Sequence, residues 1–422
     1  MHRYRRSFLE LLGETPLENF LFYLAFVCFS FAEVLSTTAF VVKYAMLAKV
    51  CQAMLYAVIP MLLARMLLLR ETKRQWIVSL IVFVLVAYIY LRYKFEYPFW
   101  IFLFLFAGKG ANLKKLAKIT LVLVSALTVA SVLACYAGVI ENYVIRASGD
   151  RVARSAMGFT HPNRFGERIA EICIAYWYLQ AQAHRGRVIA LNFVALLLVN
   201  SVADSRGSSI VFAMLIAAAF LYPFLSRAPR LSTMLCGAMV VGVILLSYYL
   251  MVAYDPGNVL MASLNVSTSG RLSLMNESYR YSGLSLFGSD FSHAPVVALH
   301  YLDGSDVHFL VDNAYARLVL LNGLVPTALL LVLLLLVYTK QFKKRCFTLS
   351  LLGLSILLAF GLVENFPLDI QYNYFLFLIT EVVFERSEAS KRGTDLEQNN
   401  GFNVGALPSV SLVATQQNPS LT

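Results

Sequence analysis

Long apolar runs without a charged side chain constrain the fold of this chain most strongly. The run 231–253 contains no Asp, Glu, Lys or Arg, and several other runs approach its length. A helix needs about 20 consecutive apolar residues to cross a bilayer, so each run of this kind is a candidate span. Hydrophobic residues make up 59% of the chain and charged residues 14%, more apolar surface than soluble domains bury. The sequence therefore predicts a polytopic membrane protein.

The runs predict an all-α fold, a polytopic transmembrane helical bundle of about 12 spans. We expect residues 1–384 to form the membrane domain and residues 385–422, rich in Asn, Gln, Ser and Gly, to form a disordered cytoplasmic tail. The fourth span is too short to cross alone, but omitting it would break the alternation of the loops. The expected spans are 20–42, 45–69, 75–91, 96–107, 117–140, 164–183, 187–203, 207–225, 231–253, 313–338, 347–364 and 368–384.

Basic residues in the loops predict the orientation. With both termini in the cytoplasm, every short cytoplasmic loop holds at least two Lys or Arg, in agreement with the positive-inside rule. The same bias accounts for the net charge of +11 without a nucleic-acid partner. We therefore expect a multi-pass protein of the cytoplasmic membrane, with a large outer loop at 254–311 between spans nine and ten. The expected cytoplasmic loops are 70–74, 109–118, 184–187, 227–230 and 340–345.

Several arginines fall on or near the outer side, against this charge bias. A phosphate-bearing ligand would explain them, because the planar guanidinium grips phosphate oxygens in pairs. These arginines are Arg146, Arg151, Arg154, Arg164, Arg168, Arg206, Arg271, Arg280 and Arg317.

Four polar segments stand at the outer ends of spans that begin outside. A helix that starts there directs free backbone N–H groups and the positive end of its dipole toward the outer face, which favours anions. Arg164, Arg206 and Arg317 reinforce three of these starts. The segments are GFTHPNRFGE at 158–167, DSRGSS at 204–209, VDNAYAR at 311–317 and ENFPLD at 364–369.

The first segment has a structural and a functional interpretation. The sequence HPN at 161–163 allows an extended residue and then a helix start. Arg164, Arg168 and Glu171 follow on one helix face, and Glu171 in the membrane is expected to pair with Arg168 or Arg164. The structural interpretation is a capped helix with an ion pair. The functional one, which we favour, adds Asn163, Arg164 and Arg168 to a substrate site.

The other segments carry similar alternatives. Arg206 could be an interfacial residue beside a helix cap, but Gly207 would let a ligand approach the backbone closely. Asp312 could act as a general base, or Asp312 and Asn313 could form only an N-cap pair. Glu364 ends an apolar helix, where it could bind substrate or merely close a cavity.

Motifs for metals and nucleotides are missing from the sequence. The six cysteines lack CxxC spacing, and the histidines form neither HxH nor HExxH. The glycines form neither a P-loop nor GxGxxG. We therefore expect no metal, no cofactor and no nucleotide substrate.

The order of these motifs resembles the Wzy-type polysaccharide polymerases, which are related to the O-antigen ligases. The resemblance covers roughly residues 150–375 and includes the layout of many spans with one large outer loop before the last few. The motifs that carry it are GFTHPN at 158–163, DSRGSS at 204–209, GRLSL at 270–274, VDNAY at 311–315 followed by Asn322-Gly323-Leu324, and Glu364.

The resemblance implies a metal-independent glycosyltransferase that joins lipid-linked oligosaccharide repeat units into capsular polysaccharide, exopolysaccharide or O-antigen. The implied substrate is an undecaprenyl-pyrophosphate-linked oligosaccharide in the outer leaflet, among membrane lipids. Chain-length regulator and flippase proteins are the implied protein partners. In the ligases a His-Asn pair opens the helix after the large loop, whereas this chain has Asp312-Asn313, which favours the polymerase.

The expected mechanism is direct displacement with inversion at the anomeric carbon. Arginines hold the donor diphosphate, and Asp312, His308 or His161 takes the proton of the acceptor hydroxyl. The expected catalytic residues are Asp312, Arg206, Arg271 and His161, and the expected substrate-binding residues are Asn163, Arg164, Arg168, Arg280, Asn313, Tyr315, Arg317 and Glu364.

Two alternative functions stay open on the sequence. An O-antigen ligase-like transferase with another acceptor would share the arginine chemistry. A lipid-linked oligosaccharide flippase or transporter would carry charged residues through the bundle centre on several helices, whereas here they gather toward one face.

Overall fold

The computed structural model describes residues 17–69, 73–93, 97–146, 152–295, 298–299 and 306–384. The tail predicted at 385–422, Arg151 and His300 lie outside these ranges. The structure is 76% helix and 2% strand, which confirms the helical class. Within the described residues, eight helices are long and apolar enough to cross a membrane, namely α2, α4, α5, α7, α9, α10, α11 and α15.

The elements follow one another with short connections, and the longest connection leads from α13 to β3. Their bounds are α2 Leu17–Ser36, α3 Ala39–Lys43, α4 Ala45–Leu68, α5 Lys73–Tyr93, α6 Tyr97–Ala107, α7 Leu113–Tyr136, β1 Val144–Ile145, β2 Arg154–Ser155, α8 Pro162–Gln180, α9 Arg185–Val202, α10 Arg206–Leu225, α11 Pro229–Ala253, α12 Val259–Ser267, α13 Arg271–Ser282, β3 Ala298–Leu299, β4 Asp306–Val307, α14 Ala314–Asn322, α15 Leu324–Lys344, α16 Leu349–Phe360, η1 Phe366–Leu368, η2 Tyr374–Phe377 and α17 Leu378–Phe384. β1 pairs with β2 and β3 with β4, both antiparallel.

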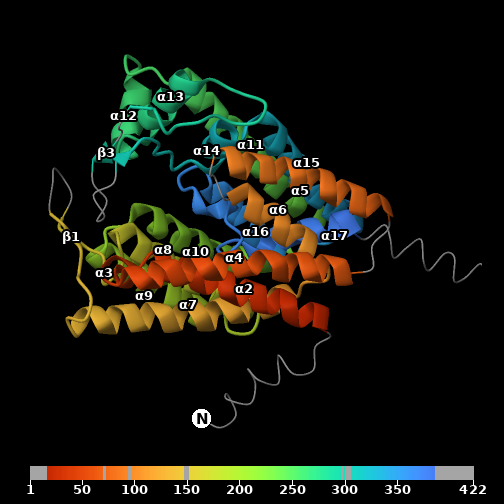
Figure 1. Cartoon of the computed structure of the whole chain (residues 1–422), viewed down its shortest axis with the longest axis horizontal. Helices are drawn as coiled ribbons and strands as arrows, with labels where there is room; N and C mark the ends of the chain where they lie inside the picture. The colour runs from red at the N-terminus through yellow and green to blue at the C-terminus, as the bar shows by residue number, and fades with distance from the viewer. Residues whose placement is uncertain are drawn as a thin grey trace, which may run out of the picture.

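The long helices lie alongside one another, and α12, α13 and β3 form a lobe at one end of the bundle (Figure 1). α2 packs on α4 and α7, α8 packs on α7, α9 and α10, and α11 packs on α15 and α16. Aromatic side chains fill much of the core. The Phe104 ring of α6 lies 6.3 Å from that of Phe22 and 5.0 Å from that of Phe29, between ring centroids.

The predicted first span is interrupted. α2 ends at Ser36, and the hydroxyls of Thr37 and Thr38 donate to carbonyls of the preceding turn at 2.7 Å. Such side-chain bonds compete with the helix and favour its end. Thr38 then forms a β-bridge with Phe159, so this break holds the segment that leads into α8.

The predicted tenth span is also two helices, α14 and α15, separated by Gly323. Its φ of +86° belongs to the region that glycine adopts without strain. The backbone of Gly323 lies against that of Gly288, and a Cβ on either would overlap the other segment. The loop after α13 completes the break, because Ser285 O accepts from the N–H of Leu324. A tertiary contact therefore decides where this helix is divided.

The segment predicted as the twelfth span, 368–384, is not one helix. It consists of the end of η1, the turn η2 and the short helix α17. Pro367 cannot donate a backbone hydrogen bond, and the side chains of Asp369 and Asn373 bond nearby backbone groups. The apolar composition is as expected, but these side chains replace the regular helical ladder with local bonds.

The predicted fourth span corresponds to α6, a short helix enclosed by protein. Its residues Phe99–Ala107 are each 8% exposed or less. α6 contacts α4, α5 and α17. Its high hydropathy therefore reflects burial among other helices and not contact with lipid along its length.

Candidate functional site

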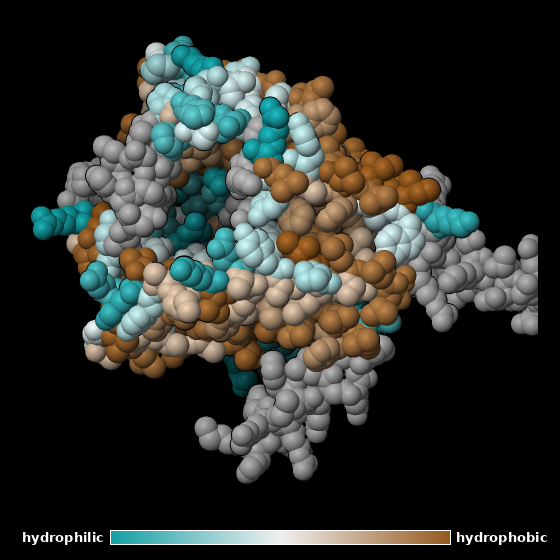
Figure 2. Space-filling model, viewed as in Figure 1, coloured by the Kyte–Doolittle hydropathy of each residue, from teal (hydrophilic) through white to brown (hydrophobic). Residues whose placement is uncertain are grey.

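A cavity of about 620 Å³ lies where the lobe meets the bundle. Figure 2 shows a hollow with hydrophilic walls at this end, beneath the lobe. The lining residues come from β2, α8, α10, α13 and α14, from the end of α12 and the turn after it, and from the segments before α8, before α14 and after α16. The lining residues are Arg154, His161, Asn163, Arg164, Glu167, Arg206, Gly207, Ile210, Ser267, Thr268, Ser269, Arg271, Leu274, Phe309, Leu310, Asp312, Arg317, Val363, Glu364 and Asn365.

Several helices begin at this cavity. His161 is the N-cap of α8, and its Nδ1 accepts from the Asn163 N–H at 3.1 Å. α10 begins at Arg206, and α13 begins at Arg271 after Gly270. Gly270 has a φ of +82°, which brings the chain round sharply into α13. Helix starts direct N–H groups and positive dipole ends toward a shared space, which favours an anion.

The fourth segment singled out from the sequence, 364–369, differs from the other three. It opens the three-residue turn η1 and not an α-helix, so it contributes no substantial helix dipole. Its contribution is the side chains of Glu364 and Asn365, which line the cavity.

Arg271 joins three parts of the wall. Its Nε lies 2.9 Å from Asp312 Oδ2, its Nη2 lies 2.9 Å from Glu364 Oε1, and its Nη1 donates to the carbonyl of Val363. Burial alone would lower the pKa of Arg271, but the carboxylates of Glu364 and Asp312 raise it above its ordinary value. The guanidinium therefore stays charged and ties the lobe helix α13 to the bundle.

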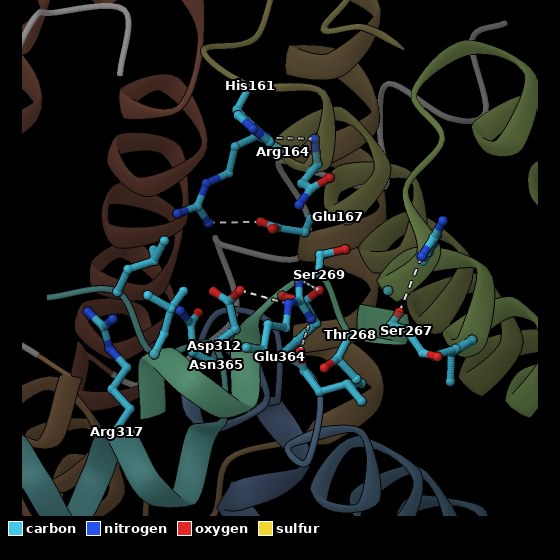
Figure 3. Close-up of a pocket in the computed structure, with 18 of the residues that line it drawn as sticks. His161, Arg164, Glu167, Ser267, Thr268, Ser269, Asp312, Arg317, Glu364 and Asn365 are labelled. Atoms are coloured by element: carbon cyan, nitrogen blue, oxygen red, sulfur yellow. Dashed lines mark hydrogen bonds and ion pairs between the residues drawn. The ribbon is translucent and has the colours of Figure 1, made fainter. Parts of the chain in front are cut away.

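Two other arginines approach the cavity from the bundle side. Arg164 Nη1 lies 2.8 Å from Glu167 Oε2, and the Tyr372 hydroxyl donates to the same Glu167 oxygen at 3.3 Å. Arg206 is exposed and donates from Nη1 to the carbonyl of Ser267 at 3.2 Å. Figure 3 shows His161, Arg164 and Glu167 across the cavity from Asp312, Glu364 and Asn365.

The cavity carries an excess of positive charge. Its lining includes five arginines and three carboxylates, a formal excess of two positive charges when all are ionised. The arginines are Arg154, Arg164, Arg206, Arg271 and Arg317, and the carboxylates are Glu167, Asp312 and Glu364. Opposite charges within one cavity suit a ligand that combines an anionic group with hydroxyls.

Four residues predicted for the site lie outside the cavity lining. Arg168 is buried and pairs with Glu171 at 2.9 Å, one of the two partners that the sequence left open for Glu171, and its guanidinium carbon lies 4.7 Å from the Tyr372 ring centroid. Arg280 is exposed on α13. Asn313 caps α14 and donates to Ser247 and to the Leu362 carbonyl, and the buried Tyr315 hydroxyl donates to the Leu358 carbonyl. The contacts of Arg168, Asn313 and Tyr315 are those of structural residues.

The three candidate bases differ in their surroundings. Asp312 lines the cavity, held by Arg271. His161 also lines it, but its Nδ1 accepts a backbone N–H, so a neutral ring carries its proton on Nε2 and donates there. His308 is outside the lining, with Nδ1 2.6 Å from the Ala294 carbonyl oxygen.

Several cavity residues were not predicted from the sequence. Arg154 stood among the outer arginines but not among the proposed site residues. Glu167 had a signal, since it lies three residues after Arg164. The polar run at 267–269 directly before Gly270 was a further signal. Nothing in the sequence alone brings Phe309 and Leu310 to the same cavity.

Gly207 was expected to let a ligand approach the backbone, but in the structure the Glu364 side chain lies against it. A Cβ on Gly207 would overlap the carboxylate of Glu364. Gly207→Ala is therefore expected to push Glu364 away from Arg271 and to lower the unfolding free energy by about 1–3 kcal/mol. Gly186→Ala is the matched control, because its Cβ would meet nothing within 4 Å, and replacing a helical glycine stabilises slightly. Thermal unfolding of the purified variants checks this, and equal midpoints would contradict the close approach.

Neither a metal site in the described part of the chain nor a similar known protein indicates what the cavity binds. Across the described residues, no group of three or more His, Cys, Asp or Glu is placed to hold a metal ion. In comparisons with known proteins, no family model, no curated protein and no solved structure matches the chain. The fold defines a helical membrane protein with a cavity at one end of the bundle.

Proposed function

We propose that this protein polymerises polyprenyl-diphosphate-linked oligosaccharide repeat units at the outer face of the cytoplasmic membrane. The observation that carries the proposal is the convergence of five arginines with helix starts around one cavity at the end of a membrane bundle. A diphosphate at the end of a membrane lipid matches both the charge of the cavity and its position.

The membrane arrangement that we propose has twelve crossings with both termini in the cytoplasm. α8 and α10 start at the cavity, so the loops that follow them, 181–184 and 226–228, lie about one bilayer thickness away. Arg185 and Arg187 adjoin the first loop and Arg227 lies in the second. The positive-inside rule then assigns these loops to the cytoplasm and the cavity to the outer side.

In this proposal Arg206 and Arg164 hold the donor diphosphate. Arg206 is exposed at the start of α10, and Arg164 lies in the first turn of α8. For Arg271 we propose a different role from diphosphate binding, because Asp312 and Glu364 already compensate its charge. We assign it to positioning Asp312 beside the place where the acceptor hydroxyl binds.

The proposed reaction is one displacement. The acceptor hydroxyl oxygen of one lipid-linked unit attacks the anomeric carbon of the donor chain, and the bond from that carbon to the diphosphate breaks. Asp312 accepts the hydroxyl proton, which contributes a factor on the order of 10²–10⁴. The arginines stabilise the negative charge on the departing lipid diphosphate. The sugar anomeric configuration is inverted.

The buried charges behind the cavity bear on the flippase alternative. Arg168 and Glu171 are each 1% exposed, and Gln371 donates to Glu171 at 3.1 Å. Asp369 is 4% exposed nearby, two residues before Gln371. These groups are packed against protein and do not line the cavity. A flippase would need a polar path through the bundle, so their burial favours the polymerase, whose site lies at the membrane surface.

The proposal is tested with purified protein in lipid vesicles and an undecaprenyl-diphosphate-linked repeat unit. The expected product is a ladder of lipid-linked oligomers with inverted linkages and one lipid diphosphate released per bond. Transfer to a different lipid acceptor without a ladder would instead support a ligase. Movement of the substrate across the vesicle without new glycosidic bonds would support a flippase and contradict the proposal.

A further inference from the structure

Helix α12 of the lobe turns its apolar side chains outward. Val259, Leu260, Leu264 and Val266 are 85%, 69%, 40% and 78% exposed. Asn265, a polar residue, is less exposed and accepts a hydrogen bond from the backbone of α13 at 3.0 Å. A helix on a water-exposed lobe normally shows the reverse pattern, with its apolar side chains buried and its polar ones outside.

The outward apolar side chains of α12 lie on one side of the helix, with the exposed Ser263 and Ser267 between them. At about 100° per residue, residues 259, 260, 264 and 266 fall within an arc of about 160°. The sequence of α12, VLMASLNVS, contains no charged residue. No residue of α12 is fully buried in the protein. The lobe therefore presents an uncharged and largely apolar face to its surroundings.

The chain places this face near the plane where α11 leaves the bilayer. α11 ends at Ala253 and α12 begins at Val259, and the five intervening residues reach at most about 18 Å. The last turns of α11 expose Leu245, Tyr249 and Val252, spaced by four and three residues along one side of this spanning helix. The apolar surface of α11 thus leads up to α12.

We propose that α12 is an interfacial helix that rests in the lipid leaflet at the cavity end of the bundle, with Val259, Leu260, Leu264 and Val266 among the lipids. Helices of this kind lie in the membrane plane and insert their apolar face about 5–10 Å into the boundary between headgroups and acyl chains. The absence of charge on α12 and its closeness to α11 favour lipid over a soluble partner. This inference does not depend on the proposed enzymatic function.

The position of α12 links the membrane to the cavity wall. Its last residue, Ser267, and the following Thr268 and Ser269 line the cavity. The Ser267 carbonyl accepts from Arg206, at the start of α10. An α12 held by lipid therefore fixes the turn that closes this side of the cavity and the arginine that contacts it.

Photocrosslinking of the full chain in phospholipid nanodiscs tests the inference. A benzophenone amino acid replaces Leu260 or Val266 in separate variants, and Glu277 in the control, an exposed residue of the neighbouring helix α13. Intact-mass analysis after illumination is expected to show a one-phospholipid adduct at positions 260 and 266 in yields about fivefold above those at 277. Equal yields at the three positions, no lipid adduct, or a crosslink between two copies of the chain would overturn it.

Discussion

Arg206→Gln is expected to lower the rate of polymer formation by a factor on the order of 10²–10³ without unfolding the protein. Under the proposed function the guanidinium stabilises charge on the departing diphosphate, an interaction that grows in the transition state. Its contribution to stability is small, because the side chain is exposed and its 3.2 Å hydrogen bond to the Ser267 carbonyl is also exposed. Arg206→Lys keeps the charge but cannot bind two phosphate oxygens in a bidentate way, so we expect an intermediate rate.

Arg280→Gln is the matched control for Arg206→Gln. It removes the same charge from another exposed arginine, which lies in the last turn of α13 and outside the cavity lining. The control is expected to retain nearly the full rate. Initial rates of lipid-diphosphate release in vesicles provide the measurement at matched protein levels. Equal losses in the two variants would show that net charge matters and the cavity arginine does not.

Arg271→Met is expected to lower the unfolding free energy by an amount on the order of 3 kcal/mol. The substitution keeps much of the side-chain volume but leaves Asp312 and Glu364 without the cation between them. Those two side chains are 23% and 9% exposed, so water compensates them only in part. Thermal or denaturant unfolding in detergent is the measurement.

Arg164→Met is the control variant for the loss of unfolding free energy expected in Arg271→Met. Its pair with Glu167 has 37% of the arginine side chain exposed, and the Tyr372 hydroxyl still donates to Glu167 in the variant. The expected cost is therefore about 1 kcal/mol or less. A cost at Arg271 no larger than that at Arg164 would contradict the role of Arg271 as the charge between two carboxylates.

Neutralising Arg271 together with its two carboxylate partners separates the effect on stability from the effect on activity. Combining Arg271→Met with Asp312→Asn and Glu364→Gln removes the unpaired charges, so stability is expected to return toward that of the unsubstituted protein. Polymer formation is expected to stay lost, because the proposed base is gone. Recovery of the rate together with stability would exclude Asp312 as the proton acceptor.

The sequence allowed prediction of much of the cavity because its signals are local. A proline after an extended residue and an Asn or Ser before an apolar run each mark a helix start within a few residues, and the arginines were singled out beside those starts. His161, Arg206 and Asp312 were found in this way, and they line one cavity. The helical class followed from equally local information, the length of the apolar runs.

The predicted spans differ from the helices of the structure where contacts that hydropathy does not register decide the backbone. Gly323 divides a helix because it lies against Gly288, and hydropathy cannot register that contact. The apolar run 368–384 forms turns, because Asp369 and Asn373 bond the local backbone. α6 has the hydropathy of a span but is enclosed by α4, α5 and α17.

The residues and their order were enough to predict a helical membrane protein with several arginines near helix starts. Which of those side chains share a cavity depends on the packing of the helices. Arg271 and Glu364 are 93 residues apart in the chain yet form an ion pair, whereas Arg168, four residues from Arg164, lies buried behind the wall. The physical reason is that helix formation depends on neighbours within one or two turns. Charge pairing across a bundle depends on how helices pack, which a periodic pattern does not encode.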